Sequence, residues 1–343
     1  MTDRARVTIP ACGRMGGRDE GPERRVPDRA GGRVLQVGFV NNMPEAAFEE
    51  THQGFARLVL AGAGERDIDL RCYRIPSVSR GPTAFDSGSH GYRDVEDLYG
   101  DPPDALVVTG TEPLAGELTD ERYWAALATL LHWAEATVPS TLLSCLAAHG
   151  ALWALDQTKR VGLPAKRSGV FPHAVDQSHR LGRGLGAEAA FPHSRWNEVP
   201  GESVLSVGYG IVVGTAGREW TVAARERDGR MLVLVQGHPE YAPTVLLREY
   251  RRDLRRFLAG SAPAPPRIPE GYLDESGEEL LLAWSDWMER HGSAERWHTL
   301  LFDSLAGHIV PCWSDAAVRL FANWLADAGC RTAHSLTDGR ARA

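Results

Sequence analysis

The sequence predicts an α/β protein with a doubly wound, mostly parallel sheet and helices on both of its faces. Three observations support this fold class. Strand-like and helix-like segments alternate along the chain. The strand-like segments are near-continuous apolar runs, which is typical of parallel strands that are covered on both sides. Finally, small or chemically active residues follow the ends of several runs, where open sheets of this kind form their sites.

The first half of the chain supplies most of the expected sheet. Apolar residues at helical spacing predict helices, and short apolar runs bounded by turn residues predict strands. A Gly/Ser/Pro-rich loop at 76–92 interrupts the pattern. The expected elements are strands at 33–42, 67–75 and 104–110, helices at 45–62 and 119–136, and a strand at 139–145 that ends in Cys145 and leads into a helix.

The second half of the chain returns to the sheet and then becomes helical. Short β-rich runs over 201–236 predict hairpins or a meander, and the last run leads to His238. A basic helix is expected at 243–259 and further helices at 276–302 and 314–328, after a Pro-rich segment at 261–269. We therefore expect a disordered Arg/Gly-rich N-terminus at 1–32, a main domain at 33–262 and a helical C-terminal extension at 263–343.

Composition narrows the classes of function. The chain has 343 residues and a net charge of −7, which argues against nonspecific nucleic-acid binding. No apolar run reaches the roughly 20 residues of a membrane-spanning helix, and the N-terminus lacks the apolar core of a signal peptide. The five cysteines are scattered without CxxC spacing. This usage argues against a metal site or a disulfide framework and fits a reducing cytoplasm.

Cys145, His238 and Glu240 form the candidate catalytic set. A thiolate is the reactive form of cysteine, and a helix N-terminus and a neighbouring histidine both stabilise it. Cys145 precedes a predicted helix, and His238 ends another apolar run with Glu240 two residues later. Glu240 would orient His238 and stabilise its cation. An acyl-enzyme mechanism is therefore the leading hypothesis, against the alternative of a buried structural cysteine.

Backbone amides near Cys145 are the candidate oxyanion donors. The amide of Leu146 would point toward the acyl oxygen, and a second donor is expected from the loop after Asn42, at Glu45 or Ala46. His149 is a rival base, but it lies one turn along the same predicted helix. We expect His149 to be buried or satisfied locally.

Several segments, in order and with matching spacing, resemble the homoserine O-acyltransferases of methionine biosynthesis, which have a class I glutamine-amidotransferase-like fold. The similarity runs from about Val34 to Arg256 and resumes near the C-terminus. The segments that carry it are 41-NNMPE-45, 107-VVTGTEP-113, 123-YW-124, 141-TLLSCLAAHGAL-152, 166-KRSGVF-171, 192-PHSRW-196, 237-GHPEY-241, 249-EYRRD-253 and 320-LFANWL-325.

The resemblance implies a role for each matching residue. Cys145 would take the acyl group from acyl-CoA as a thioester, and His238, oriented by Glu240, would deprotonate the acceptor hydroxyl. The amino-acid substrate would be bound by Lys166, Ser194 and Arg252. The resemblance also implies that acyl-CoA, carrying succinyl or acetyl, is a co-substrate, that no cofactor is bound, that L-homoserine is the acceptor, and that the enzyme is a cytoplasmic homodimer.

Three departures from the family pattern bear on specificity. Where the family usually has lysine after N-x-M-P, this chain has Glu45 and Ala46. The position that separates succinyl from acetyl donors aligns with Leu114, and nearby Glu112 could repel succinate. Extra sequence at about 275–310 could extend an oligomer interface or cap the site.

Other functions remain open at this point. A paralogue could acylate serine or another hydroxy amino acid. A glutamine amidotransferase or amide hydrolase would use the same Cys–His–Glu set, although the N-x-M-P loop and Lys166 argue against it. A catalytically silent binding protein on this fold is a third alternative, which the intact triad opposes.

Overall fold

The computed structural model describes residues 33–78, 91–215, 219–291 and 302–341. Its central feature is a sheet of eight strands in the order β3-β2-β1-β4-β5-β10-β9-β8. The strands from β3 to β10 in this order pair in parallel, and β9 and β8 are antiparallel. The predicted fold class is confirmed. The strands are β1 (Leu35–Val40), β2 (Ile68–Arg74), β3 (Arg93–Asp94), β4 (Ala105–Val108), β5 (Ser140–Ser144), β8 (Gly210–Thr215), β9 (Glu219–Arg227) and β10 (Arg230–Val235).

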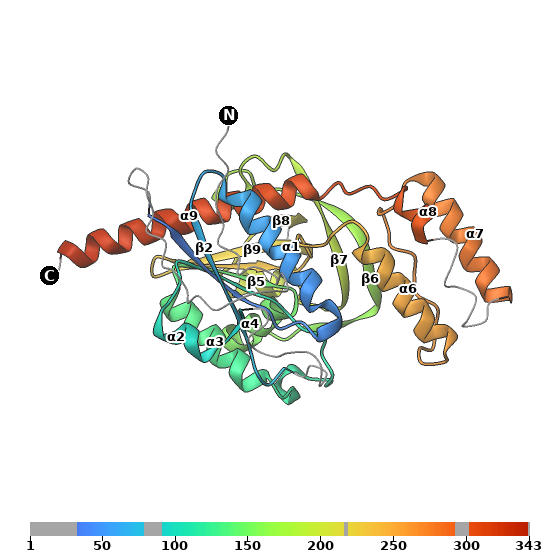
Figure 1. Ribbon diagram of the computed structural model, residues 1–343, viewed down its shortest axis with the longest axis horizontal. Coiled ribbons are helices and arrows are strands. Elements are labelled where there is room, and N and C mark those ends of the chain that lie inside the picture. The colour runs from blue at the N-terminus through green and yellow to red at the C-terminus, as the bar shows by residue number, and fades with distance from the viewer. Residues whose placement is uncertain (1–32, 79–90, 216–218, 292–301, 342–343) are drawn as a thin grey trace, which may run out of the picture.

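Helices cover both faces of this sheet (Figure 1). One face packs against α1 (Glu45–Ala63) and α9 (Ser314–Ala341), and the other packs against α2 (Glu96–Gly100), α3 (Trp124–Thr137) and α4 (Leu146–Asp156). Strand β4 shows why its sequence is apolar throughout. Val107 joins the first hydrophobic cluster and Val108 joins the second, because successive side chains point to opposite faces.

A two-stranded antiparallel sheet lies beside the main one. It pairs β6 (Val161–Ala174) with β7 (Glu188–Glu198), a region for which the apolar pattern gave no expectation. The β-rich prediction for 201–236 is confirmed except at its start, where α5 (Gly201–Ser206) is helical. Val204 of α5 is buried, so this turn contributes to the core. Two short 3₁₀ turns, η1 (Leu118–Asp120) and η2 (Arg180–Gly182), complete this part.

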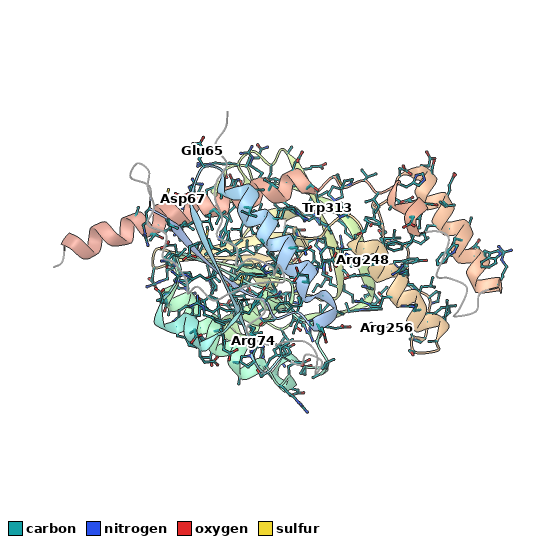
Figure 2. All side chains as sticks on the ribbon, in the orientation of Figure 1. Glu65, Asp67, Arg74, Arg248, Arg256 and Trp313 are labelled. Atoms are coloured by element: carbon teal, nitrogen blue, oxygen red, sulfur yellow. The ribbon has the colours of Figure 1, made fainter. Side chains whose placement is uncertain are left out.

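A third, smaller cluster holds the helices after the sheet. It contains residues from α6 (Val245–Leu258), α7 (Glu275–His291) and α8 (Phe302–Ala306), which extend to one side of the molecule (Figure 1). Figure 2 labels Arg248 and Arg256 on α6, and also Trp313, whose buried ring belongs to this cluster. The helix expected at 276–302 is observed as α7, which is described as far as His291. Residues 292–301 lie outside the described residues, as does the N-terminus at 1–32.

Helix α9 returns to the main core from this cluster. The buried indole of Trp324 donates a hydrogen bond from Nε1 to Ser140 Oγ at 2.9 Å, at the start of β5. Phe321 packs near Phe55 of α1, with ring centroids 6.2 Å apart. The last helix of the chain therefore completes the face of the sheet that α1 covers.

Candidate active site

Two neighbouring strands bring the candidate nucleophile and base together. Strands β5 and β10 are parallel partners, and their registers match Ser144 with Val235. The amide of Cys145 donates a hydrogen bond to the Val235 carbonyl at 2.7 Å. His238 follows three residues later, where its amide donates to the Pro192 carbonyl of β7 at 2.8 Å. The carboxyl ends of adjacent strands thus place both side chains at one edge of the sheet.

Cys145 occupies a sharp turn between β5 and α4. Its backbone has φ 51° and ψ −112°, a conformation that non-glycine residues rarely adopt and that costs about 1–3 kcal/mol. Such a turn exposes a nucleophile at the top of a strand and directs the first amides of the following helix toward the same space. Leu146 is the first residue of that helix, so its amide is one of those without a partner inside the helix. Its role as an oxyanion donor remains a prediction.

Gly110 allows the loop after β4 to approach the Leu146 amide. A Cβ atom at Gly110 would lie 2.8 Å from the Leu146 nitrogen, closer than real contacts permit. The loop after Asn42 is anchored beside it, since the Asn42 amide donates to Thr109 Oγ1 at 2.8 Å. Glu45 and Ala46 begin α1 just after this loop, behind Pro44. Their role as oxyanion donors remains a prediction.

His238 and Glu240 form a buried pair. Glu240 Oε1 lies 2.9 Å from His238 Nδ1, and the two residues are 7% and 9% exposed, respectively. Within the described part of the chain, His238 Nε2 and Glu240 Oε2 have no hydrogen-bond partner. A buried nitrogen with no permanent partner is available to a reacting group. Nδ1 is held by the carboxylate, so Nε2 is the atom left for proton transfer.

The charges around His238 favour its protonated form. Burial lowers the pKa of His238, but the Cys145 sulfur and the Glu240 carboxylate raise it by a larger amount. The resulting pKa is well above the ordinary value of histidine. The ring therefore carries a proton at neutral pH when Cys145 is a thiolate. This is the ion pair that an activated cysteine needs.

Helix α1 and Tyr241 hold Glu240 and His238 in place. Arg57 donates from Nη2 to the Glu240 carbonyl at 3.1 Å. Gly54 faces the same backbone, and a Cβ atom there would lie 2.5 Å from the Glu240 carbonyl oxygen. The ring of Tyr241 stacks on His238 with centroids 4.3 Å apart. These contacts fix the orientation of the imidazole.

A polar cluster beside this pair contains the predicted substrate residues Lys166 and Ser194. Lys166 Nζ lies 2.6 Å from Asp253 Oδ2 and 3.4 Å from Glu249 Oε2. Glu249 also accepts hydrogen bonds from Ser194 Oγ and, at 2.9 Å, from the Tyr241 hydroxyl. Burial alone would raise the pKa of Glu249, but Lys166 and Ser194 hold it below its ordinary value. The cluster is therefore charged and connects through Tyr241 to His238.

Arg252 reaches this cluster from α6. Its Nε lies 3.1 Å from Asp253 Oδ1, and its side chain is 45% exposed. The chain turns between Tyr241 and the first residue of α6, Val245, so the helix runs back past the site. Residues 249 and 253 are four apart and share a helix face, so this spacing is a local signal for the acidic pair of the cluster.

The loop after β4 carries the two residues that bear on acyl specificity. Leu114 is 82% exposed, and its amide donates to Glu121 Oε1 at 2.6 Å. Glu112 Oε1 lies 3.5 Å from Arg256 Nη2 of α6. The charge of Glu112 is therefore offset by Arg256, which weakens the expectation that Glu112 repels an anionic acyl group.

His149 is not placed as a base. It is buried, and its Nε2 donates to Gln236 Oε1 at 3.0 Å. Burial lowers its pKa to about 4, so the ring is neutral at physiological pH. The expectation that His149 is buried is confirmed, and its partner is Gln236, 87 positions further along the chain.

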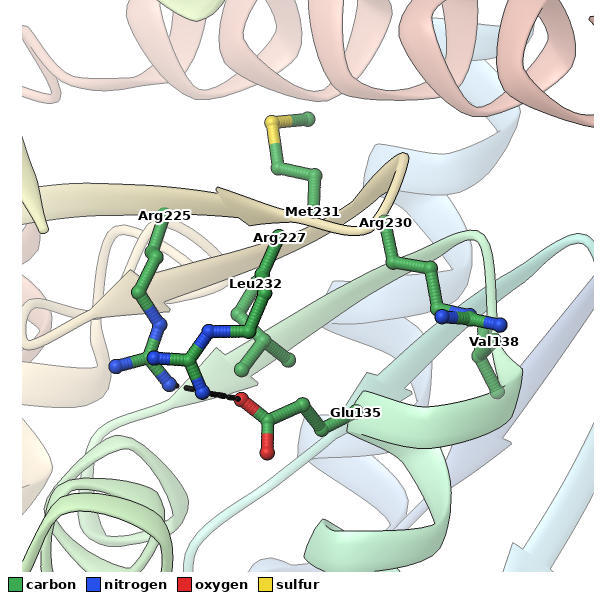
Figure 3. Close-up of a pocket in the computed structure, with 7 residues that line it drawn as sticks. All are labelled: Glu135, Val138, Arg225, Arg227, Arg230, Met231 and Leu232. Atoms are coloured by element: carbon green, nitrogen blue, oxygen red, sulfur yellow. Dashed lines mark hydrogen bonds and ion pairs between the residues drawn. The ribbon is translucent and has the colours of Figure 1, made fainter. Parts of the chain in front are cut away.

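A small pocket at the opposite end of the sheet does not belong to this site. Figure 3 shows Glu135 of α3 facing Arg225 and Arg227, beside the start of β10. Glu135 Oε1 lies 2.9 Å from Arg225 Nη2, and Arg225 Nη1 also contacts Asp156 Oδ1 at 2.5 Å. Strand β10 starts at this pocket and ends near His238, so the pocket lies at the end of the strand away from Cys145. Its charged residues pair with one another and form a structural ion-pair cluster.

Comparison with known proteins assigns the chain to a family. The family model described as "Homoserine O-succinyltransferase" matches residues 23–333. The chain belongs to the homoserine O-succinyltransferase family. Family membership makes this protein a transferase and agrees with the resemblance inferred from its motifs.

Curated homoserine O-succinyltransferases align over most of the chain. The protein is 38% identical to that of Methylorubrum extorquens over 86% of this chain and 87% of the relative. It is 41% identical to that of Rhodopseudomonas palustris over 76% and 78%, and 37% identical to that of Bradyrhizobium japonicum over 93% and 95%. A solved glutamine amidotransferase from Thermotoga maritima is more distant, at 12% identity with a TM-score of 0.45 over 87% of this chain and 99% of that one.

None of the helices in the described ranges is both long and apolar enough to cross a membrane. The same ranges contain no group of three or more His, Cys, Asp or Glu side chains placed to hold a metal ion.

Proposed function

We propose that the protein transfers an acyl group, succinyl in the first instance, from acyl-CoA to the hydroxyl of L-homoserine. The observation that carries the proposal is the buried His238–Glu240 pair beside Cys145 on its strained turn. The names of the curated relatives favour succinyl and homoserine. The product, an O-acyl-homoserine, would serve methionine biosynthesis. The protein would act in the cytoplasm as a homodimer, without a bound cofactor.

In the first half-reaction, the Cys145 thiolate attacks the thioester carbonyl of acyl-CoA. A carbon–sulfur bond forms to Cys145, and the bond to the CoA sulfur breaks. The leaving CoA thiolate takes the proton from His238 Nε2 and departs as the free thiol. The amide of Leu146 stabilises the negative charge on the tetrahedral oxygen, with a second donor from Glu45 or Ala46.

In the second half-reaction, neutral His238 removes the proton from the homoserine hydroxyl. The oxygen attacks the acyl-cysteine carbonyl, a carbon–oxygen bond forms, and Cys145 leaves as a thiolate. The proton stays on His238, which restores the starting ion pair. Glu240 stabilises the imidazolium at both stages, because one of its oxygens contacts Nδ1 throughout.

The polar cluster next to His238 is suited to an α-amino acid. Lys166 and Arg252 offer positive charge for the α-carboxylate, and Glu249 and Asp253 offer negative charge for the α-ammonium group. Ser194 adds a hydroxyl at the same place. These charged groups pair with one another here. On binding, the substrate's carboxylate would replace an acidic partner of the cations, and its ammonium group would replace a basic partner of the carboxylates.

Intact-protein mass spectrometry tests the proposal. The protein is mixed briefly with succinyl-CoA or acetyl-CoA without an acceptor, and Cys145→Ala serves as the control. We expect a succinyl adduct on the wild type, none on Cys145→Ala, and discharge of the adduct by homoserine rather than serine. Discharge by serine instead would assign the paralogue activity.

Failure would take a different form. Absence of an adduct with either donor, together with glutamine hydrolysis, would replace the acyltransferase proposal with an amidotransferase one. Absence of both activities would favour a binding protein.

A further inference from the structure

Among the described residues, Arg160 has no carboxylate partner. It directly precedes β6 and is half-buried. Its one hydrogen bond in the described part of the chain is a long one, from Nη2 to the Gly116 carbonyl at 3.4 Å, and no carboxylate there forms an ion pair with it. A half-buried guanidinium normally binds a carboxylate or phosphate, because its desolvation is otherwise uncompensated.

Tyr123 provides a second unsatisfied group at the same place. The residue is 5% exposed, and among the described residues its hydroxyl has no hydrogen-bond partner. Burial and then Glu121 raise the pKa of this hydroxyl, while Arg160 lowers it, so the phenol is neutral and able to donate. A buried donor without an acceptor is rare and points to a ligand.

The loop after β4 connects these groups to the nucleophile. The loop packs at Gly110 against Leu146, the residue after Cys145, and at Gly116 it meets Arg160. Glu121 fixes the part between them, since Oε1 accepts from the amides of Leu114 and Ala115 at 2.6 and 2.7 Å.

Electrostatic interactions agree with this placement. Burial lowers the pKa of Arg160, and Tyr123, Glu117, Glu121 and Cys145 act in the opposite direction. Cys145 is thus among the groups that act on the pKa of Arg160. Glu117 and Glu121 are acidic residues that act on Arg160. Glu121 already accepts hydrogen bonds from two amides, and within the described ranges neither carboxylate forms an ion pair with the guanidinium.

We propose that Arg160, assisted by the Tyr123 hydroxyl, binds the distal carboxylate of a dicarboxylic acyl group carried by the Cys145 thioester. The carboxylate would replace the weak contact to the Gly116 carbonyl. This inference rests on the proposed function and adds a specificity-determining pair to it. The donor would then be chosen by attraction to a succinyl-like carboxylate, and a neutral acyl group of equal length would leave both donors unpaired.

The test compares donors that differ only in the carboxylate. Rates of Cys145 acylation by succinyl-CoA, butyryl-CoA and acetyl-CoA are measured by rapid quench and intact-protein mass spectrometry. The variants are Arg160→Gln, Arg160→Lys and Tyr123→Phe. Lys159→Gln is the matched control, because Lys159 is the adjacent cation and lies over the Trp153 ring, 4.8 Å from its centroid.

We expect Arg160→Gln to slow succinylation by about 10- to 100-fold while butyryl and acetyl transfer change by less than about threefold. Arg160→Lys should recover part of the loss, Tyr123→Phe should give a smaller loss confined to succinyl, and Lys159→Gln should match the wild type. An equal loss for all three donors would assign Arg160 to the shared CoA moiety and overturn the inference.

The inference and the proposed function fail in different ways. If the wild type is acylated and Arg160→Gln keeps the wild-type preference for succinyl over butyryl, only the inference fails. If the wild type accepts none of the three donors, the proposed function fails and the inference falls with it.

Discussion

At the residue scale, we expect the reactivity of Cys145 to depend on the Glu240 carboxylate, which acts on it through His238. Glu240 contacts His238, and His238 in turn interacts with the Cys145 sulfur. The carboxylate raises the pKa of His238 against the effect of burial, so removing its charge should shift protons away from the ring. This dependence can be measured without substrate.

Glu240→Gln should therefore slow alkylation of Cys145 by iodoacetamide at pH 7 by at least about tenfold, since one pKa unit corresponds to a tenfold change in the protonation equilibrium. In the wild type the imidazolium, whose pKa is raised, should persist above pH 6.5 and be lost only as the pH rises through the raised value. Peptide mapping is needed, because Cys312 and Cys330 are exposed while burial raises the pKa of Cys72 to about 12. An unchanged Cys145 rate would contradict the prediction.

His149 should make the fold sensitive to acid. Burial lowers its pKa to about 4 from an ordinary value of 6.5, so between these pH values His149 is protonated in the unfolded chain but neutral in the folded one. The contribution of neutral His149 to the free energy of unfolding is therefore fully present above about pH 6.5 and is lost as the pH drops toward 4. Between pH 7.5 and 5 this group alone should cost about 2 kcal/mol.

Urea unfolding of the wild type and His149→Gln at both pH values checks this. Other groups titrate in the same range, so the quantity of interest is the difference between the two proteins in their pH-dependent loss. Equal losses would show that His149 does not contribute.

At the element scale, helix α1 acts on the site through a glycine. Gly54 faces the Glu240 backbone and Gly62 faces α9, where a Cβ atom would lie 2.9 Å from the Ala322 nitrogen. At both positions on this helix, an added Cβ atom would lie too close to a neighbouring backbone. At Gly54 that backbone belongs to Glu240 of the candidate site, whereas at Gly62 it belongs to α9.

Gly54→Ala should therefore lower kcat by displacing Glu240 and with it His238, whereas Gly62→Ala should leave kcat close to the wild type. Both variants gain about 1 kcal/mol of helix propensity and lose about 1–3 kcal/mol to crowding, so their stabilities should be similar. Thermal unfolding and steady-state kinetics on the two variants separate the effects. A larger kcat loss in Gly62→Ala would rule out this coupling between α1 and Glu240.

The elements also show how far the sequence could predict the fold. The buried strands and amphipathic helices follow from local apolar patterns, so β1, β4, β5 and β10 and the helices α1, α3 and α4 were expected near their observed bounds. The short helices α2 and α5 were not expected. The β6–β7 pair was missed, because its strands are partly exposed and carry residues such as Arg167 and His173 within their runs. That pair mattered, since the Pro192 carbonyl holds His238.

The site was predicted in part for the same reason. Strand ends located Cys145 and His238, because parallel strands bring their carboxyl ends to one edge. The positions of Glu249, Tyr241 and Arg160 in the site result from contacts between elements that are far apart in sequence. Apolar periodicity does not predict such contacts. Only the four-residue spacing of Glu249 and Asp253 was a usable local signal.

At the scale of the whole molecule, the C-terminal helix completes the core that holds β5. Trp324 is fully buried between α9 and the sheet and bonds to Ser140, the first residue of the strand that ends before Cys145. Helix α9 therefore supports β5, although 184 positions separate the two bonded residues.

Trp324→Ala should lower the free energy of unfolding by about 3–5 kcal/mol, because it opens a large cavity and leaves the Ser140 hydroxyl without its donor. Trp287→Ala is the matched control, since Trp287 on α7 is 42% exposed and should change stability by less than about 1 kcal/mol. Urea denaturation followed by far-ultraviolet circular dichroism measures both. If β5 depends on α9, acylation of Cys145 in Trp324→Ala should be lost at the urea concentration at which this variant unfolds, and should persist at lower concentrations. Equal stability of the two variants would mean that α9 only lies against the sheet without supporting it.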